Sequence, residues 1–446
     1  MVQLRDSRGC IHTLSKQIAH KGEAKIWLVR EDPRAVAKIY HKPSREKELK
    51  LKAMITNPPI QPKDYKATAW PRDVLYEGGR FVGFLMPNIS DKKEPLYFYN
   101  KVLRKKYFPN FNRKELHLIA RNFVGAAKSV HKEGHLIGDI NESNLLIDTQ
   151  ALVTIIDTDS FQVRDGTNIF RSPVGTPEYT PPELQSIKKF KEIDRVIEHD
   201  LFGITILIFR FLMEGKHPFA GVLPHGAAKN NVNIYLIKLG VFPYRNKRFV
   251  LPPPDAPPFD ILHPEIQELF IRCFVYGHSD PLRRPTTDEW KSVLEKAEKS
   301  LKRCPKDKGH IYSDHLKKCP WCRTQKSAQK VLPRSRLPQK KKYARPNKWK
   351  RLLLLAAILV GFQLVPIDKT FFLSFMNRYA ASWHKFTLFN RTYTVRSGDN
   401  LSDIAQKYPG VSVSDIVLAN KKYYPSLAKN PNFILPGWKL KIPRQQ

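Results

Sequence analysis

Cysteine, glycine and acidic residues are scarce in this chain of 446 residues. Its five cysteines are too few for a disulfide framework, so we expect a reducing compartment for the first 322 residues. Residues 1–30 have neither an uninterrupted apolar stretch nor a small-residue cleavage site, which predicts no cleavable secretory signal. Because 41% of the residues are apolar, the chain can bury a large core, and its length indicates two or three domains.

Basic residues outnumber acidic ones by 77 to 41, which gives a formal net charge of +36. Such a charge can indicate nucleic-acid binding. However, residues 323–351 contain twelve Lys and Arg residues and no acid, directly before an apolar run, and this pattern favours an anionic membrane face. Nucleic acid is therefore not an expected partner. The alternative, a nucleic-acid module at 301–351, predicts DNA binding that weakens steeply with salt.

The apolar run covers residues 352–367 and is interrupted by Gln363 and Pro366. Its sixteen residues fall short of the roughly 20 that span a bilayer, but flanking cations and local thinning can close the gap. We predict a single transmembrane helix there, between a basic linker at 324–351 and a juxtamembrane segment at 368–391. The positive-inside rule then places the N-terminal side in the cytoplasm and the C-terminal side outside it. The alternative is a buried core helix.

A Cys/His cluster precedes the linker, at residues 301–323. A CxxC pair near a third Cys and a His is typical of a structural zinc site, because thiolates and imidazoles fill a tetrahedral shell. So short a segment cannot bury a core, and a metal gives it a reason to fold. The predicted Zn²⁺ ligands are Cys304, His310, Cys319 and Cys322, with His315 as the alternative to His310.

The region from about residue 10 to 300 is rich in strand patterns first and in helical patterns later, which suits two lobes. Asp139 and Asn144 stand five residues apart, and Asp157 follows the buried-strand run 152–156. Earlier, the strand-like stretch 34–38 ends in Lys38. This ordered set resembles the protein kinase family. The resemblance implies a kinase fold over residues 1–300, with an N-lobe at about 1–88 and a C-lobe at about 89–300.

The resemblance also implies a role for each residue that it matches. Asp139 would be the catalytic base, and Asn144 and Asp157 would hold Mg²⁺. For ATP, Lys38 would grip the phosphates, Gly22 would lie in the covering loop, and Glu48 would pair with Lys38, with Glu46 as the alternative partner. Further along the chain, Glu183 and Arg284 match a structural ion pair of the family.

The sequence departs from the kinase pattern at several positions. The covering loop has only Gly22, and Asn141 and Asp159 replace a lysine and a glycine of the pattern. Gly138 replaces the arginine before the catalytic Asp, so activity should not need phosphorylation of the activation loop. These departures leave an alternative open, a weak or inactive pseudokinase that serves as a scaffold.

The last region, residues 392–444, resembles a LysM domain. The match rests on the strand Tyr393–Val395, the turn and helix 397–405 and the helix 413–420. The resemblance implies two helices on a two-stranded sheet that binds glycans containing N-acetylglucosamine. The implied glycan contacts are Gly398, Asp399, Asn400 and Asn432.

Together these patterns predict an α+β multidomain protein with a kinase-like fold, a zinc ribbon, one transmembrane helix and a βααβ LysM domain. We interpret it as a single-pass bacterial membrane kinase of the Ser/Thr type, using ATP and Mg²⁺. Its expected partners are cytoplasmic protein substrates, the membrane and cell-wall glycan of the peptidoglycan kind. We also expect dimers or clusters, because one helix must carry a signal from one outer module.

Overall fold

The computed structural model divides the chain into two compact units, residues 1–335 and 336–446. It describes residues 2–223, 231–245 and 250–322 of the first unit. In the second it describes residues 391–395, 399–408, 411–420, 423–424, 427, 434 and 438–443. The predicted linker 324–351, transmembrane helix 352–367 and juxtamembrane segment up to residue 390 lie outside the described residues. Among the helices that the structure does describe, none has the length and apolar character needed to cross a bilayer.

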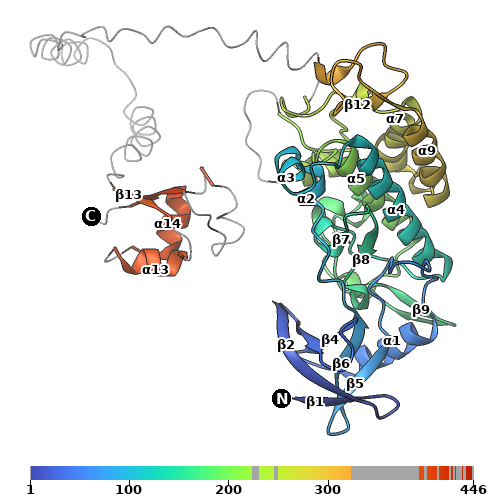
Figure 1. The fold of residues 1–446 in the computed structure, drawn as a ribbon, viewed down its shortest axis with the longest axis vertical. Coiled ribbons are helices and arrows are strands. Elements are labelled where there is room, and N and C mark those ends of the chain that lie inside the picture. Colours follow the sequence, from blue (N-terminus) through green and yellow to red (C-terminus); the bar gives the residue numbers. More distant parts are fainter. Residues whose placement is uncertain are drawn as a thin grey trace, which may run out of the picture. The chain divides into compact units, whose positions relative to one another are not determined.

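The first unit begins with a closed antiparallel barrel of six strands, at the lower end of the unit in Figure 1. The strands follow the order β1-β2-β3-β4-β6-β5, and β1 closes the barrel by pairing with β5. Alternating apolar side chains fill its interior: Leu4, Leu14, Val29, Ala37, Leu75 and Leu85. The strands are β1 (Gln3–Asp6), β2 (Ile11–Lys21), β3 (Ala24–Val29), β4 (Ala35–Tyr40), β5 (Asp73–Glu77) and β6 (Arg80–Pro87).

Helix α1 (Arg45–Thr56) packs on the outside of this barrel, against β5 and β6. Ser44 starts it by accepting a hydrogen bond from the Lys47 amide at 3.2 Å. Leu51 and Met54 are buried in the core that continues into the helical lobe. Two charged residues of the same helix, Glu48 and Lys50, are also buried.

The helical lobe is built around α4 (Arg113–Lys132), which packs against α5 (Ile197–Leu212) and α9 (Thr287–Lys299). Asn112 and Glu115 form a capping box at the start of α4. Residues 200–209 of α5 are all buried and mostly apolar, as expected of a helix at the centre of a lobe. The remaining helices are α2 (Leu96–Tyr99), α3 (Lys101–Tyr107), α6 (Val232–Leu239), α7 (Pro264–Ile271) and α8 (Gly277–Ser279).

Short hairpins and single helical turns connect the main elements of the first unit. The hairpins are β7 (Leu145–Ile147) with β8 (Val153–Ile155), β9 (Val163–Asp165) with β10 (Asn168–Phe170), and β11 (Leu301–Arg303) with β12 (Ile311–Ser313). The helical turns used below are η1 (Glu142–Asn144), η2 (Thr158–Ser160), η3 (Pro177–Tyr179) and η4 (Pro182–Leu184).

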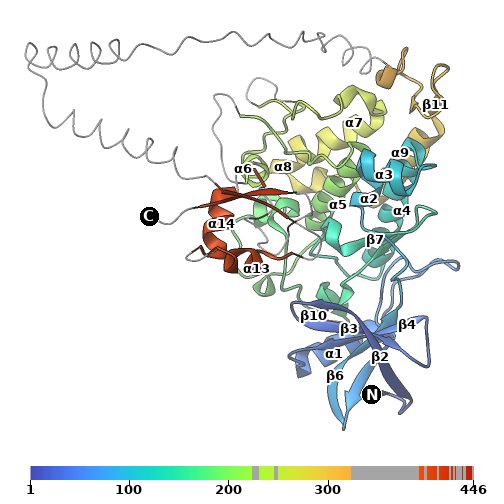
Figure 2. The ribbon, with the colours of Figure 1, turned by 60° about the vertical axis from the view of Figure 1, so that its left-hand side comes forward.

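The second unit has the βααβ order that the sequence predicts: β13 (Arg391–Thr394), α13 (Leu401–Gln406), α14 (Val413–Asn420) and β14 (Lys439–Ile442). The two strands pair antiparallel, with Tyr393 opposite Leu440; α14 lies against them and α13 packs on α14 (Figure 2). Asn420 is fully buried, and its side chain exchanges hydrogen bonds of 2.7 Å with the main chain of Lys441. The side-chain amide of Asn420 thus joins the end of α14 to the main chain of β14.

Candidate active site

The loop between α4 and β7 carries Asp139 and Asn144. The Asn144 side-chain amide donates to the main-chain oxygen of Asp139 at 3.0 Å and lies 3.4 Å from its Oδ2. Across the loop, the Thr176 hydroxyl donates to Asp139 Oδ1 at 2.8 Å. Each oxygen of the Asp139 carboxylate therefore lies next to a hydrogen-bond donor, Thr176 or Asn144. Asn141, which replaces a lysine of the kinase pattern, caps η1 and donates to the Asp139 main chain at 3.2 Å.

Asp200, in the first turn of α5, holds this loop from below. Its side chain is buried and accepts hydrogen bonds from the amides of Ile137 at 2.7 Å and Gly138 at 2.9 Å. His131 on α4 contacts the same carboxylate at 2.9 Å. No role for Asp200 is predicted from the sequence. The available signal was an acid at the start of an otherwise apolar helix, where a buried charge needs several donors.

Lys38 on β4 reaches across from the barrel to two carboxylates. Its Nζ lies 2.7 Å from Asp157 Oδ1 and 2.7 Å from Asp159 Oδ1. Tyr40, two residues along the same strand face, donates its hydroxyl to Asp159 Oδ2 at 2.6 Å. The structure therefore brings the predicted phosphate-binding lysine and the predicted metal-binding Asp157 together.

The electrostatics of this cluster favour charge. Burial lowers the pKa of Lys38, but the carboxylates of Asp159 and Asp157 outweigh burial and leave this pKa raised. Burial raises the pKa of Asp159, but Lys38, Tyr40 and Lys50 together outweigh burial and leave this pKa lowered, so Asp159 stays ionised. Lys50 on α1 is buried near the same carboxylates, and burial lowers its pKa to about 8.

The predicted pairing of Lys38 with Glu48 is wrong for this structure. Glu48 instead binds Lys52 at 2.7 Å, Tyr76 at 2.8 Å and Arg45 at 2.8 Å. The hydrogen bond from Lys52 is the main reason why the pKa of Glu48 falls to about 2. The alternative partner, Glu46, is exposed. Asp159 takes the place expected for Glu48, because it comes from a turn that faces β4.

Gly22 lies in a tight turn between β2 and β3, where Lys21 pairs with Ala24. The turn holds only Gly22 and Glu23, and the Glu23 carboxylate lies 3.5 Å from Lys38 Nζ. The phosphate-covering loop expected from the kinase pattern is therefore short, and it carries an acid at its tip.

Glu183 and Arg284 form a two-pronged ion pair, with distances of 2.7 and 2.8 Å. The Arg284 side chain is fully buried and also donates to the main chain of Glu198 at 2.9 Å. The pair thus joins η4 to α5 and to the segment before α9.

Two of the four predicted glycan contacts in the second unit are described. The Asp399 carboxylate accepts from the Tyr393 hydroxyl at 2.9 Å. Asn400 caps α13 by accepting from the Asp403 amide at 2.9 Å. Both side chains thus serve local structure. Gly398 and Asn432 lie outside the described residues.

The geometry agrees with comparisons to known families. Residues 84–295 match the protein kinase domain model. The chain carries a protein kinase domain. Residues 393–443 match the LysM domain, and together the two matches confirm the predicted α+β fold with these two domains.

Two curated relatives each match about 70% of the chain. The protein kinase YegI of Escherichia coli (strain K12) is 32% identical over 326 residues, which cover 72% of this chain and 50% of YegI. The YegI protein of Escherichia coli O157:H7 is also 32% identical, over 315 residues, covering 70% of this chain and 48% of that protein. The chain thus spans about half the length of these relatives.

The predicted Cys/His cluster is assembled at the end of the first unit, beside the kinase domain. The ligand atoms of Cys304, His310, Cys319 and Cys322 all lie within 4.8 Å of one another, so the four residues could hold a metal ion. Cys304 and Cys322 Sγ are 3.6 Å apart, and His310 Nδ1 lies 3.5 Å from Cys322 Sγ. A tetrahedral site with Zn–S bonds of about 2.3 Å separates its ligand atoms by about 3.8 Å, so the donor set fits zinc.

Neighbouring groups support this metal assignment. His310 Nε2 lies 3.4 Å from Asp307, which leaves Nδ1 free to face the thiols. The alternative ligand, His315, binds Ser313 at 2.9 Å and the main chain of Asp260 in the kinase domain at 3.0 Å. It is therefore a docking residue and not a metal ligand.

Proposed function

We propose that this chain is an ATP-dependent protein kinase of the Ser/Thr type. The observation that carries the proposal is the contact at Asp139, whose Oδ1 accepts a hydrogen bond from the aliphatic hydroxyl of Thr176 at 2.8 Å. A general base must lie within this distance of the proton that it takes. An alcohol thus reaches the proposed base in the geometry that a Ser or Thr acceptor needs.

The surrounding residues divide the work of phosphoryl transfer. Asp139 would take the proton of the acceptor hydroxyl. The oxygen of that hydroxyl would bond to the γ-phosphorus as the bond from the γ-phosphorus to ADP breaks. Asn144 and Asp157 carry the oxygen ligands that Mg²⁺ prefers, and the ion would neutralise the phosphate charge. Lys38 would turn from the carboxylates to the phosphates, and Asp159 would hold it in reach.

A second candidate, a nucleotide-binding scaffold without transfer activity, is favoured by two observations. Lys38 is held by both Asp157 and Asp159, so nucleotide must displace one contact before Lys38 reaches phosphate. The turn above the site holds one glycine and one acid, Glu23, whose charge opposes phosphate.

We further propose that the kinase domain is cytoplasmic and the LysM domain extracytoplasmic, on either side of a membrane helix at 352–367. The support is the cation-rich stretch before that run, which favours the cytoplasmic face. The protein substrates would then lie in the cytoplasm, and the LysM domain would bind cell-wall glycan. Dimers or clusters on the wall would carry the signal inward.

Phosphate transfer from radiolabelled ATP by the full-length protein, in detergent with Mg²⁺, tests the catalytic proposal. Casein serves as an added acceptor. The variants Asp139→Asn and Asp157→Ala should each lower transfer by about a hundredfold or more, since each loses the base or a metal ligand. The control is Asp194→Asn, which removes an exposed carboxylate that pairs with Arg171 at 2.8 Å.

A folded wild-type protein that binds Mg-ATP but transfers no phosphate would make the scaffold the better description. Equal transfer by wild type and both active-site variants would point to a contaminating kinase. Acid hydrolysis of the labelled product would show whether phosphoserine and phosphothreonine, and not phosphotyrosine, are formed.

A further inference from the structure

We propose that Arg195 is a positioning residue. It holds residues 172–180, which belong to the activation segment of the kinase pattern, against the loop that carries Asp139. It occupies the space that Gly138 leaves open and needs no phosphate to do so. The inference rests on the proposed kinase function. Arg195 lies just before α5 and is only 6% exposed. Nothing in the sequence pattern marks it as part of the site.

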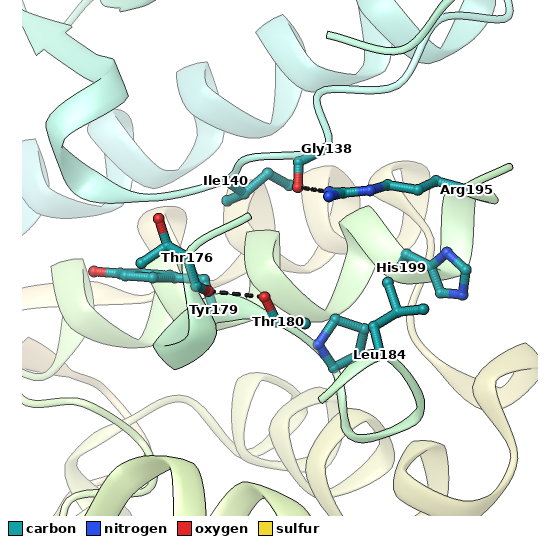
Figure 3. Close-up of a pocket in the computed structure, with 9 residues that line it drawn as sticks. Gly138, Ile140, Thr176, Tyr179, Thr180, Leu184, Arg195 and His199 are labelled. Atoms are coloured by element: carbon teal, nitrogen blue, oxygen red, sulfur yellow. Dashed lines mark hydrogen bonds between the residues drawn. The ribbon is translucent and has the colours of Figure 1, made fainter. Parts of the chain in front are cut away.

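The guanidinium of Arg195 bridges two segments that meet at Asp139. It donates to the main-chain oxygen of Gly138, the residue before Asp139, as Figure 3 shows. It also donates to the main-chain oxygen of Val174, two residues before Thr176. Since Thr176 binds the Asp139 carboxylate, one side chain braces both sides of the proposed base.

Two glycines make room for this guanidinium. Gly138 has a φ of +74°, and a Cβ there would lie 2.7 Å from Ser172 Oγ and 3.1 Å from Arg195 Nη1. A Cβ on Gly175 would lie 3.1 Å from Arg195 Nη2. An arginine at 138, as in the kinase pattern, would therefore compete with Arg195 for the same space. The glycine at position 138 thus leaves the space in which the Arg195 guanidinium is buried.

Arg195 is itself fixed on three sides. Its main-chain amide and oxygen bond the side chain of Gln162 at 2.9 and 3.0 Å. Gln162 in turn pairs with Leu136, just upstream of the catalytic loop, through two main-chain bonds of 2.9 Å. The guanidinium lies 4.5 Å from the centre of the Phe190 ring. The brace is thus built into the resting fold.

The charge of the brace suits its position. Burial lowers the pKa of Arg195, while the carboxylates of Asp200 and Asp139 raise it, and a guanidinium stays protonated in proteins. In kinases that need activation, a phosphate added to the loop pairs with an arginine and orders the segment. Here main-chain oxygens occupy the guanidinium, so the segment is ordered without that phosphate.

The test uses the full-length protein after exhaustive phosphatase treatment, with casein as the acceptor. Arg195→Gln and Arg195→Lys are compared with Arg171→Gln, a cation of the same segment whose side chain is 42% exposed. We measure hydrogen exchange of residues 172–180 without nucleotide, then kcat and the KM for ATP. Lysine keeps the charge but cannot bridge two oxygens as a planar fork does.

We expect both Arg195 variants to exchange residues 172–180 faster, while Arg171→Gln behaves as wild type. Their kcat should fall about 10- to 100-fold, with the KM for ATP within about twofold of wild type, because the base is displaced while the phosphate site is intact. Phosphatase-treated wild type should retain its transfer activity.

Unchanged exchange at 172–180 in both Arg195 variants would overturn the proposal, as would loss of wild-type transfer on phosphatase treatment. If Arg195→Gln fails to fold, Arg195→Lys supplies the same readouts. A wild type that transfers no phosphate would refute the proposed function instead, and the exchange data would still test the brace.

Discussion

Asp159 shows how one residue can change which ion pairs form in a kinase-like site. It replaces a glycine of the kinase pattern, and its buried carboxylate binds Lys38 and Tyr40 at 2.7 and 2.6 Å. The acid that the pattern would pair with Lys38, Glu48, faces Lys52 and Tyr76 instead. The carboxylate that supports Lys38, the proposed phosphate-binding lysine, thus comes from η2 and not from α1.

The variant Asp159→Asn should therefore weaken ATP binding, because Lys38 loses a charged partner. Hydrogen bonds to charged groups contribute about 1.5–3 kcal/mol, which corresponds to a rise in the ATP dissociation constant of about tenfold or more. Titration calorimetry with Mg-ATP would measure it. Glu48→Gln is the matched control and should change the constant by less than about twofold. A larger effect of Glu48→Gln than of Asp159→Asn would restore the original pairing.

The buried His217 should make the folded protein less stable in acid. It is buried, its Nε2 donates to the Glu178 main chain at 2.8 Å, and burial lowers its pKa to about 3. Below a pH of about 6.5, His217 binds a proton in the unfolded chain but stays neutral in the folded chain. The free energy of unfolding therefore falls as the pH drops from about 6.5 towards about 3.

The slope should reach about 1.4 kcal/mol per pH unit for this group. Urea unfolding would be measured from about pH 4.5 to about pH 7.5. The free energy of unfolding of His217→Gln should depend less steeply on pH than that of wild type. His41→Gln, at an exposed histidine, is the control. Parallel curves for wild type and His217→Gln would refute the assignment.

At the scale of elements, the Cys/His cluster is docked on the helical lobe. The Trp321 indole donates to the main chain of Ile311 at 3.0 Å and packs against the main core. The Lys101 ammonium and the Arg113 guanidinium lie over its ring at 5.1 and 5.4 Å. The hairpin β11–β12 and the CxxC turn thus cover the starts of α3 and α4.

Removal of metal should loosen this cover and destabilise the lobe beneath it. We expect one zinc per chain by elemental analysis, and a melting temperature lower by about 5 °C after chelation or in Cys319→Ser. Limited proteolysis should then cut within residues 301–322. Cys10→Ser, at an exposed thiol outside the cluster, should melt as wild type does. A metal-free wild type with unchanged melting would exclude a structural role for zinc.

At the scale of the whole molecule, the order of the parts predicts opposite locations for the two domains. In spheroplasts of cells that produce the protein, added protease should digest the LysM domain and spare the kinase domain, because only the C-terminal side faces out in the proposed topology. Lysis with detergent should expose sites in both, which is the control. Protection of both domains in intact spheroplasts would contradict the proposed topology.

Much of the site could be predicted because its parts are local in sequence. Asp139, Asn144 and Asp157 lie on one loop and the hairpin after it, so their spacing almost determines their geometry. The same holds for the four residues of the Cys/His cluster and for the βααβ order of the LysM domain. Each of these patterns needs only a turn or a hairpin to bring its residues together.

The partners of buried charges were decided by the tertiary structure alone. Lys38 meets Asp159 across 121 residues, and Arg195 meets Gly138 across 57, where many pairings satisfy the same sequence. Which one forms depends on how the barrel, α1 and α5 pack, because a buried charge takes whichever partner the packing places within reach. The sequence by itself determined which chemical groups this protein has, and the packing of its lobes decided which of them act together.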